Sequence, residues 1–148
     1  MTRRIEHIVI HCSATNPSQD IGAEEIDAWH KKRGWAGIGY HYVIRRNGEI
    51  EKGRPDDKAG AHVQGHNART LGICLIGGLG DDNRAKPAYT AKQWDTLELL
   101  VRHLKTQHPK AEVLGHRDFP SINKACPCFN VADWWAFVNE TNERAVGK

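Results

Sequence analysis

Short apolar runs of strand length recur along the chain and are separated by segments with helical spacing. The most continuous of these runs is almost entirely apolar, which is typical of a central strand that is covered on both faces. Asn47-Gly48 lies between two further strand-like segments and predicts a β-hairpin. The predicted strands span residues 6–11, 40–44, 49–51, 71–78 and 112–114.

Three segments have apolar residues at helical spacing. The first begins after Gly22, has Glu24 and Glu25 in its first turn, and ends near residues 33–34. The second begins at Thr90, which is a suitable cap, and the third begins near residue 130. Helices that alternate with strands predict an α/β fold, with a mixed central β-sheet flanked by helices. We expect one domain, residues 1–148.

Composition and charge narrow the class of protein. The chain has 148 residues and a formal net charge of +3, and its basic residues are scattered, so we expect neither nucleic acid nor a membrane as a partner. We find no apolar signal segment at the start and no run of about 18 apolar residues, so we expect a protein that folds in the cytoplasm. Four cysteines, of which Cys126 and Cys128 are separated by one residue, are expected to be thiols.

Three residues have the chemistry of a zinc site. His11 and His116 each follow an apolar run, where α/β sheets place their sites, and Cys126 comes ten residues after His116. Two histidines and one cysteine leave the fourth tetrahedral position open, which is typical of catalytic zinc. On spacing alone, Cys128 is an alternative to Cys126, and we expect Pro127 to direct the two thiols to different environments. Most of the nine histidines are expected to have ordinary structural roles.

Five motifs, in order along residues 8–135, resemble those of the zinc N-acetylmuramoyl-L-alanine amidases of the phage lysozyme type. The resemblance implies the fold shared by these amidases and the peptidoglycan recognition proteins. It also implies Zn²⁺ as the cofactor, with His11, His116 and Cys126 as its ligands. The motifs are His-Cys-Ser-Ala-Thr at 11–15, Gly-Tyr-His-Tyr at 39–42, Gly-Ala-His-Val-Gln-Gly-His-Asn at 60–67, Gly-Ile-Cys-Leu-Ile-Gly-Gly at 72–78 and Lys-Ala-Cys-Pro at 124–127.

The resemblance also assigns roles that spacing does not. It implies that Tyr40 and Lys124 are catalytic and that His62 and Asn67 lie around the substrate groove, where they orient either the peptide or the groups behind the zinc ligands. From the residues alone, Tyr40 is a strand aromatic that shares a face with Tyr42, and Lys124 is a solvated loop charge.

The leading hypothesis is an endolysin that cleaves the amide bond between the lactyl group of N-acetylmuramic acid and L-alanine in bacterial peptidoglycan. We expect a monomer that reaches the cell wall from the host cytoplasm through a holin-type pore. The alternatives are a non-catalytic peptidoglycan-binding module and a regulator of a phage RNA polymerase, both of the same fold.

Overall fold

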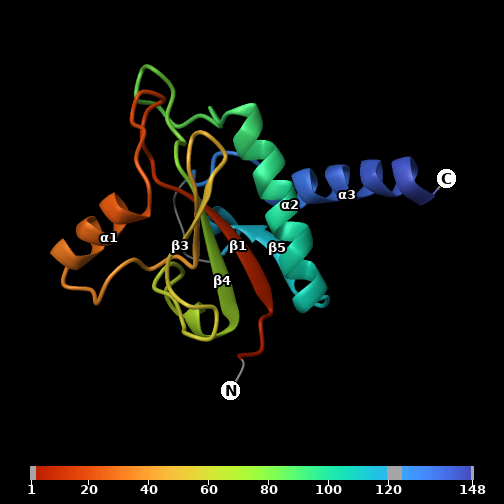
Figure 1. The fold of residues 1–148 in the computed structure, drawn as a ribbon, viewed down its shortest axis with the longest axis horizontal. Helices are drawn as coiled ribbons and strands as arrows, with labels where there is room; N and C mark the ends of the chain where they lie inside the picture. The colour runs from red at the N-terminus through yellow and green to blue at the C-terminus, as the bar shows by residue number, and fades with distance from the viewer. Residues whose placement is uncertain (1–2, 120–124, 148) are drawn as a thin grey trace.

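The computed structural model describes residues 3–119 and 125–147, with side chains described up to residue 140. Five strands form one sheet in the order β3-β2-β4-β1-β5. Helix α1 lies on one side of this sheet, and α2 and α3 lie on the other (Figure 1). The strands are β1 (His7–Cys12), β2 (Tyr42–Ile44), β3 (Ile50–Lys52), β4 (Thr70–Leu75) and β5 (Glu112–Gly115).

Most of the sheet is parallel. Strand β1 pairs in parallel with β4 on one side and with β5 on the other, and β2 pairs in parallel with β4. The hairpin strand β3 is antiparallel to β2. All six residues of β4 are buried, as predicted for a central strand. Because β1, β4 and β5 run in the same direction, their carboxyl ends meet at one edge of the sheet.

The two faces of the sheet differ in character. Side chains of alternate residues, such as Ile8 and Ile10 of β1, join the large apolar core that α2 and α3 cover. The residues between them face the α1 side, where Val9 packs in a smaller cluster with Val63 and Phe119. His11 has the same parity as Val9, so its imidazole lies on the α1 side.

The helices begin where the sequence predicts. Helix α2 (Ala91–Gln107) is capped by Thr90, whose Oγ1 accepts a hydrogen bond from the Gln93 backbone N–H at 3.1 Å. Helix α1 (Ala23–Lys32) follows Gly22, whose N–H donates to the Glu25 carboxylate at 2.7 Å. Helix α3 is Val131–Gly147, and it projects away from the sheet (Figure 1).

Two sequence predictions about the sheet are wrong in detail. The apolar run 71–78 ends as a strand at Leu75, because the chain turns at Gly77 and Gly78, whose φ angles are 138° and 96°. Tyr40 precedes β2, which begins at Tyr42. The side chain of Tyr42 joins the core under α2 and α3. Tyr40 instead packs against a second cluster on the α1 side, which includes Ile26 and Val43, so the two tyrosines do not share a face.

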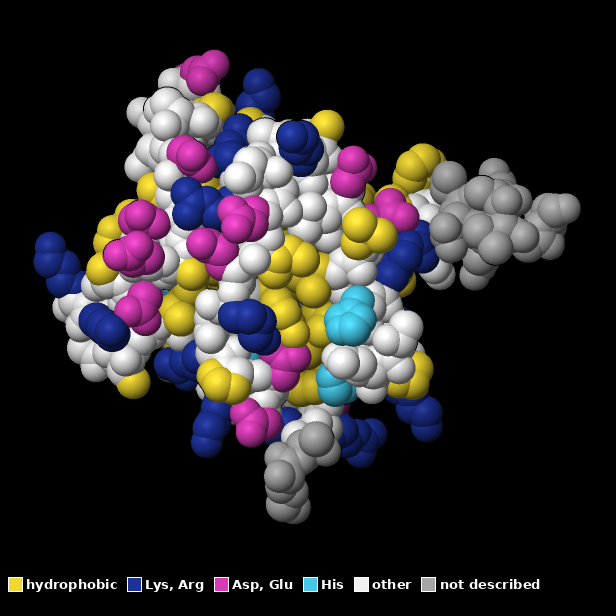
Figure 2. Space-filling view, in the orientation of Figure 1, with side chains coloured by type: hydrophobic (Ala, Val, Ile, Leu, Met, Phe, Trp, Pro, Cys, Tyr) yellow, Lys and Arg dark blue, Asp and Glu magenta, His cyan; other side chains and the backbone are white. Residues whose placement is uncertain are grey.

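Charge is dispersed over the face of the molecule that carries α2 (Figure 2). Figure 2 shows acidic and basic side chains interspersed on this face, without a large patch of one sign. Among the described residues, no helix combines the length and apolar character needed to span a bilayer.

Candidate metal centre

Two neighbouring parallel strands bring His11 and His116 together. His11 is the fifth residue of β1, and His116 begins the short 3-10 helix η2 (His116–Asp118) directly after β5. Because β1 pairs with β5, the two imidazole centroids lie 4.4 Å apart. His11 therefore lies within its strand, which continues one residue past the predicted span 6–11, to Cys12. His11 is 1% exposed.

Cys126 reaches this pair from the loop that precedes α3. Its carbonyl accepts a hydrogen bond from the Arg117 N–H at 3.0 Å, which ties the loop to the segment that holds His116. The Cys12 backbone N–H donates to Cys126 Sγ at 3.0 Å. Within the described residues, the donor atoms of His11, His116 and Cys126 all lie within 4.8 Å of one another.

The neighbouring thiol of Cys128 lies apart from this group. Cys128 has a φ of 77°, and its Sγ–H donates to the Gly78 carbonyl at 3.3 Å. The expected separation of the two thiols is thus present in the structure.

The donor set fits a zinc ion. Two imidazole nitrogens and a thiolate are preferred zinc ligands, and three protein ligands leave one position for water or substrate. Contact with Cys12 and burial raise the pKa of the Cys126 thiol. The thiolate form therefore needs a compensating positive charge beside it, and a bound cation would provide one.

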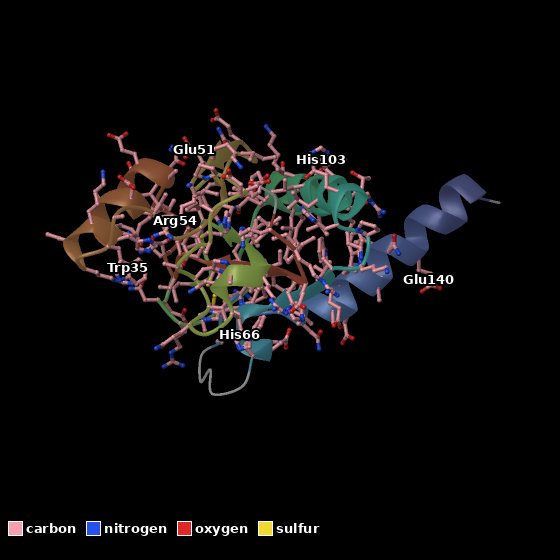
Figure 3. All side chains as sticks on the ribbon, turned by 90° about the horizontal axis from the view of Figure 1, so that it is seen from below. Trp35, Glu51, Arg54, His66, His103 and Glu140 are labelled. Carbon is pink, nitrogen blue, oxygen red and sulfur yellow. The ribbon has the colours of Figure 1, made fainter. Side chains whose placement is uncertain are left out.

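A pocket of about 210 Å³ is lined by two of the three donors, His116 and Cys126, and by Cys12, the residue after His11. Its wall includes the polar turn after β1, where Ala14 has a φ of 57°, and the end of α1, where Trp29 is 41% exposed. Figure 3 shows Trp35 and Arg54 on this α1 side of the molecule, and His103 and Glu140 on the side of α2 and α3. The site therefore lies on the sheet face opposite the large core.

Tyr40 forms part of the same pocket wall. Its ring centroid lies 5.0 Å from that of His11. The Tyr40 backbone is fixed by the Arg54 N–H, which donates to its carbonyl at 2.9 Å. Burial, followed by the nearby Cys74 thiol, raises the pKa of Tyr40 well above its usual value, so its phenol is neutral.

His62 and Asn67 lie behind the metal centre. His62 Nδ1 is 2.8 Å from His11 Nε2, and Asn67 Oδ1 accepts hydrogen bonds from the backbone N–H groups of His62 and Val63, both at 2.9 Å. Burial lowers the pKa of His62 to about 3, so this imidazole is neutral at physiological pH. Contact of either residue with substrate stays a prediction. Lys124, expected to be catalytic, lies outside the described residues.

The structure adds residues that the sequence reasoning did not place in the site. The Cys12 backbone donates to the Cys126 thiol, and the His30 imidazole accepts from the Gly39 N–H at 2.9 Å, immediately before Tyr40. The sequence contains one indication that Cys12 lies near the site, because Cys12 directly follows His11. The His30 contact had none, because it depends on how α1 packs over the sheet.

The fold is α/β, and the site is a group of two histidines and one cysteine that could hold a metal ion and would leave one ligand position open. The sequence profile of the N-acetylmuramoyl-L-alanine amidases matches residues 1–129. The endolysin of Klebsiella phage KP32 is 41% identical over 136 residues, which are 90% of this chain and 89% of that protein. The endolysin of Escherichia phage T7 is 39% identical over 128 residues, 86% of this chain and 83% of that protein.

Two solved structures have the same fold as this chain. The endolysin amidase LysCS from Clostridium intestinale superposes with a TM-score of 0.76 at 33% identity, covering 93% of this chain and 85% of that one. Drosophila PGRP-LB, at 23% identity and a TM-score of 0.70, covers 94% of this chain and 82% of its own and shares the fold. The chain belongs to the N-acetylmuramoyl-L-alanine amidase family, alongside phage endolysins.

Proposed function

We propose that residues 1–148 form one zinc-dependent amidase domain that acts as an endolysin. Its reaction is hydrolysis of the amide bond between the lactyl group of N-acetylmuramic acid and L-alanine in peptidoglycan. The observation that carries the proposal is the convergence of two imidazoles and one thiol within 4.8 Å beside a pocket, in a chain of the amidase family.

We propose His11, His116 and Cys126 as the residues that hold the zinc ion. Zinc at such a site supplies a Lewis acid that polarises the scissile carbonyl and lowers the pKa of a coordinated water to about 7. The protein contributes a fixed donor geometry, because His11 lies in β1, His116 directly follows the paired strand β5, and the Cys12 N–H orients the thiol.

The remaining chemistry belongs to groups around the three donors. Tyr40, a neutral phenol in the pocket wall, donates a hydrogen bond to the oxygen that becomes negative as the amide carbonyl is attacked. Lys124, two residues before Cys126 in the sequence, adds a positive charge for the same oxygen. Its role rests on the family resemblance alone.

We further propose that the protein is made in the host cytoplasm and reaches the wall through a holin-type pore. Support comes from the relatives, which are endolysins of phages. A monomeric state and an interaction with the phage RNA polymerase both stay predictions, which size-exclusion chromatography and a pull-down with the polymerase test directly.

The experiment is digestion of purified sacculi by the zinc-loaded protein. We expect release of stem peptides that begin with L-alanine, inhibition by a chelator and recovery with added zinc. Binding of soluble muropeptide without any release would instead identify a non-catalytic peptidoglycan-binding module.

A further inference from the structure

The imidazole of His62 occupies a space that two glycines create. A Cβ atom at Gly72 would lie 2.8 Å from three atoms of the His62 ring, and one at Gly60 would lie 2.6 Å from its Cδ2 atom. Asn67 holds the His62 backbone, and the residue is 8% exposed. Glycines 60 and 72 together with Asn67 therefore fix the ring at one place, directly behind His11.

The hydrogen bonds around His62 have a defined direction. Thr70 Oγ1 has a single proton, which it donates to the His66 carbonyl at 3.0 Å. The same oxygen lies 3.2 Å from His62 Nε2, so it accepts a hydrogen bond from the Nε2–H group. The Nδ1 atom of neutral His62 then has no proton and accepts from His11 Nε2–H at 2.8 Å. One backbone carbonyl thus sets the proton positions on both imidazoles.

We propose that His62 is a positioning residue that holds His11 in the tautomer with an unprotonated Nδ1 atom directed to the zinc ion. The inference rests on the proposed zinc-dependent function. Of the two roles that the family resemblance leaves open for His62, it assigns support of a zinc ligand and not contact with the peptide. Both ring nitrogens of His62 bond within the protein, to His11 and Thr70, and this arrangement serves the metal ligand.

The identity of the acceptor has a chemical consequence. Metal-bound histidines usually donate their second N–H to a carboxylate, a backbone carbonyl or water, which fixes the ring and raises its basicity. Here the acceptor is a second imidazole, and a ring nitrogen that accepts a hydrogen bond carries no proton. A neutral acceptor orients His11 without adding negative charge behind the metal, so a zinc ion in this site keeps more of its Lewis acidity than it would with a carboxylate in that position.

The test compares zinc affinity among matched variants. His62→Phe keeps an aromatic ring but removes the acceptor, and we expect the zinc Kd to rise by a factor of about 10 to 100. His62→Asn retains an acceptor oxygen near the Nδ1 position and is expected to recover most of the affinity. His103→Phe, the same change at an exposed histidine of α2 on the other side of the sheet, is the control and leaves the Kd unchanged. The Kd is measured by competition with a chromophoric chelator.

A second measurement uses the wild-type protein and does not depend on the folding of a variant. Imidazole 15N NMR of zinc-loaded protein should show His11 protonated at Nε2, with the signal identified by its loss in His11→Asn. An unchanged Kd in folded His62→Phe, or a His11 protonated at Nδ1, would overturn the proposal. If instead both readouts agree with it but sacculi are not cleaved, the proposed function fails and the role of His62 stands.

Discussion

Replacement of Tyr40 by phenylalanine separates catalysis from folding and from metal binding. The substitution keeps the ring that packs on the α1 side of the sheet and removes only the hydroxyl group, whose neighbour is Cys74. Loss of one such hydrogen bond costs about 0.5–1.5 kcal/mol of stability. Loss of one donor to a developing oxyanion lowers turnover by a factor of about 10² to 10³, or about 2.7–4 kcal/mol in the barrier. The effect on the rate should therefore exceed the effect on stability.

The assay measures release of peptides with an L-alanine amino terminus from sacculi, beside zinc content and muropeptide affinity on the same preparation. Tyr42→Phe is the matched control, because its hydroxyl donates to Asp56 Oδ2 at 2.5 Å and its ring belongs to the core on the opposite face. We expect Tyr40→Phe to retain zinc and muropeptide binding and to lose turnover, while Tyr42→Phe turns over normally. A native rate in Tyr40→Phe would refute the catalytic role of this tyrosine.

Three further predictions concern the second cysteine, the core and acid stability. Cys126→Ala should abolish zinc binding and Cys128→Ser should preserve it, as measured by the zinc content of each variant. Zinc in Cys126→Ala but not in Cys128→Ser would make Cys128 the ligand. Gln93→Leu removes the amide that donates to the carbonyls of Ile44 and Ile76, at 3.2 and 2.8 Å, and accepts from the Thr90 N–H at 2.9 Å. The free energy of unfolding in urea should therefore fall by about 2–4 kcal/mol, and a loss under about 1 kcal/mol would contradict this. Burial lowers the pKa of His41 in the folded protein, so the folded state binds this proton less readily than the unfolded chain does. The contribution of His41 to the free energy of unfolding is therefore complete above about pH 6.5. As the pH falls below that value, the contribution decreases by up to about 1.4 kcal/mol per pH unit. Urea titrations at pH 7 and 5, with chelator present, should show a weaker pH dependence for His41→Gln than for wild type, and equal dependence would count against the argument.

Local signals in the sequence were sufficient to predict most of the fold. The cap at Thr90 and the turn at Asn47-Gly48 act within a few residues, so the start of α2 and the hairpin between β2 and β3 were predicted correctly. The pairing of His11 with His116 was also predictable, because parallel strands place their carboxyl ends at one edge.

Features set by tertiary contacts were not predictable. Tyr40 precedes the regular strand and is held by Arg54, so strand alternation gave it the wrong face. The contact between His62 and His11 joins a loop without periodicity to β1, 51 residues away in sequence. The choice between Cys126 and Cys128 depends on a backbone turn at Cys128 and on the Cys12 N–H, neither of which spacing shows.

The products formed when zinc-loaded protein digests purified sacculi identify the bond that is cleaved. We expect new L-alanine amino termini that appear at the rate of lysis, one zinc per chain, and glycan strands with no new reducing ends. A chelator should stop the release of stem peptides, and added zinc should restore it in proportion to the zinc content of the protein. New reducing ends that appear at the rate of lysis, or undiminished release from protein without zinc, would contradict the proposed function.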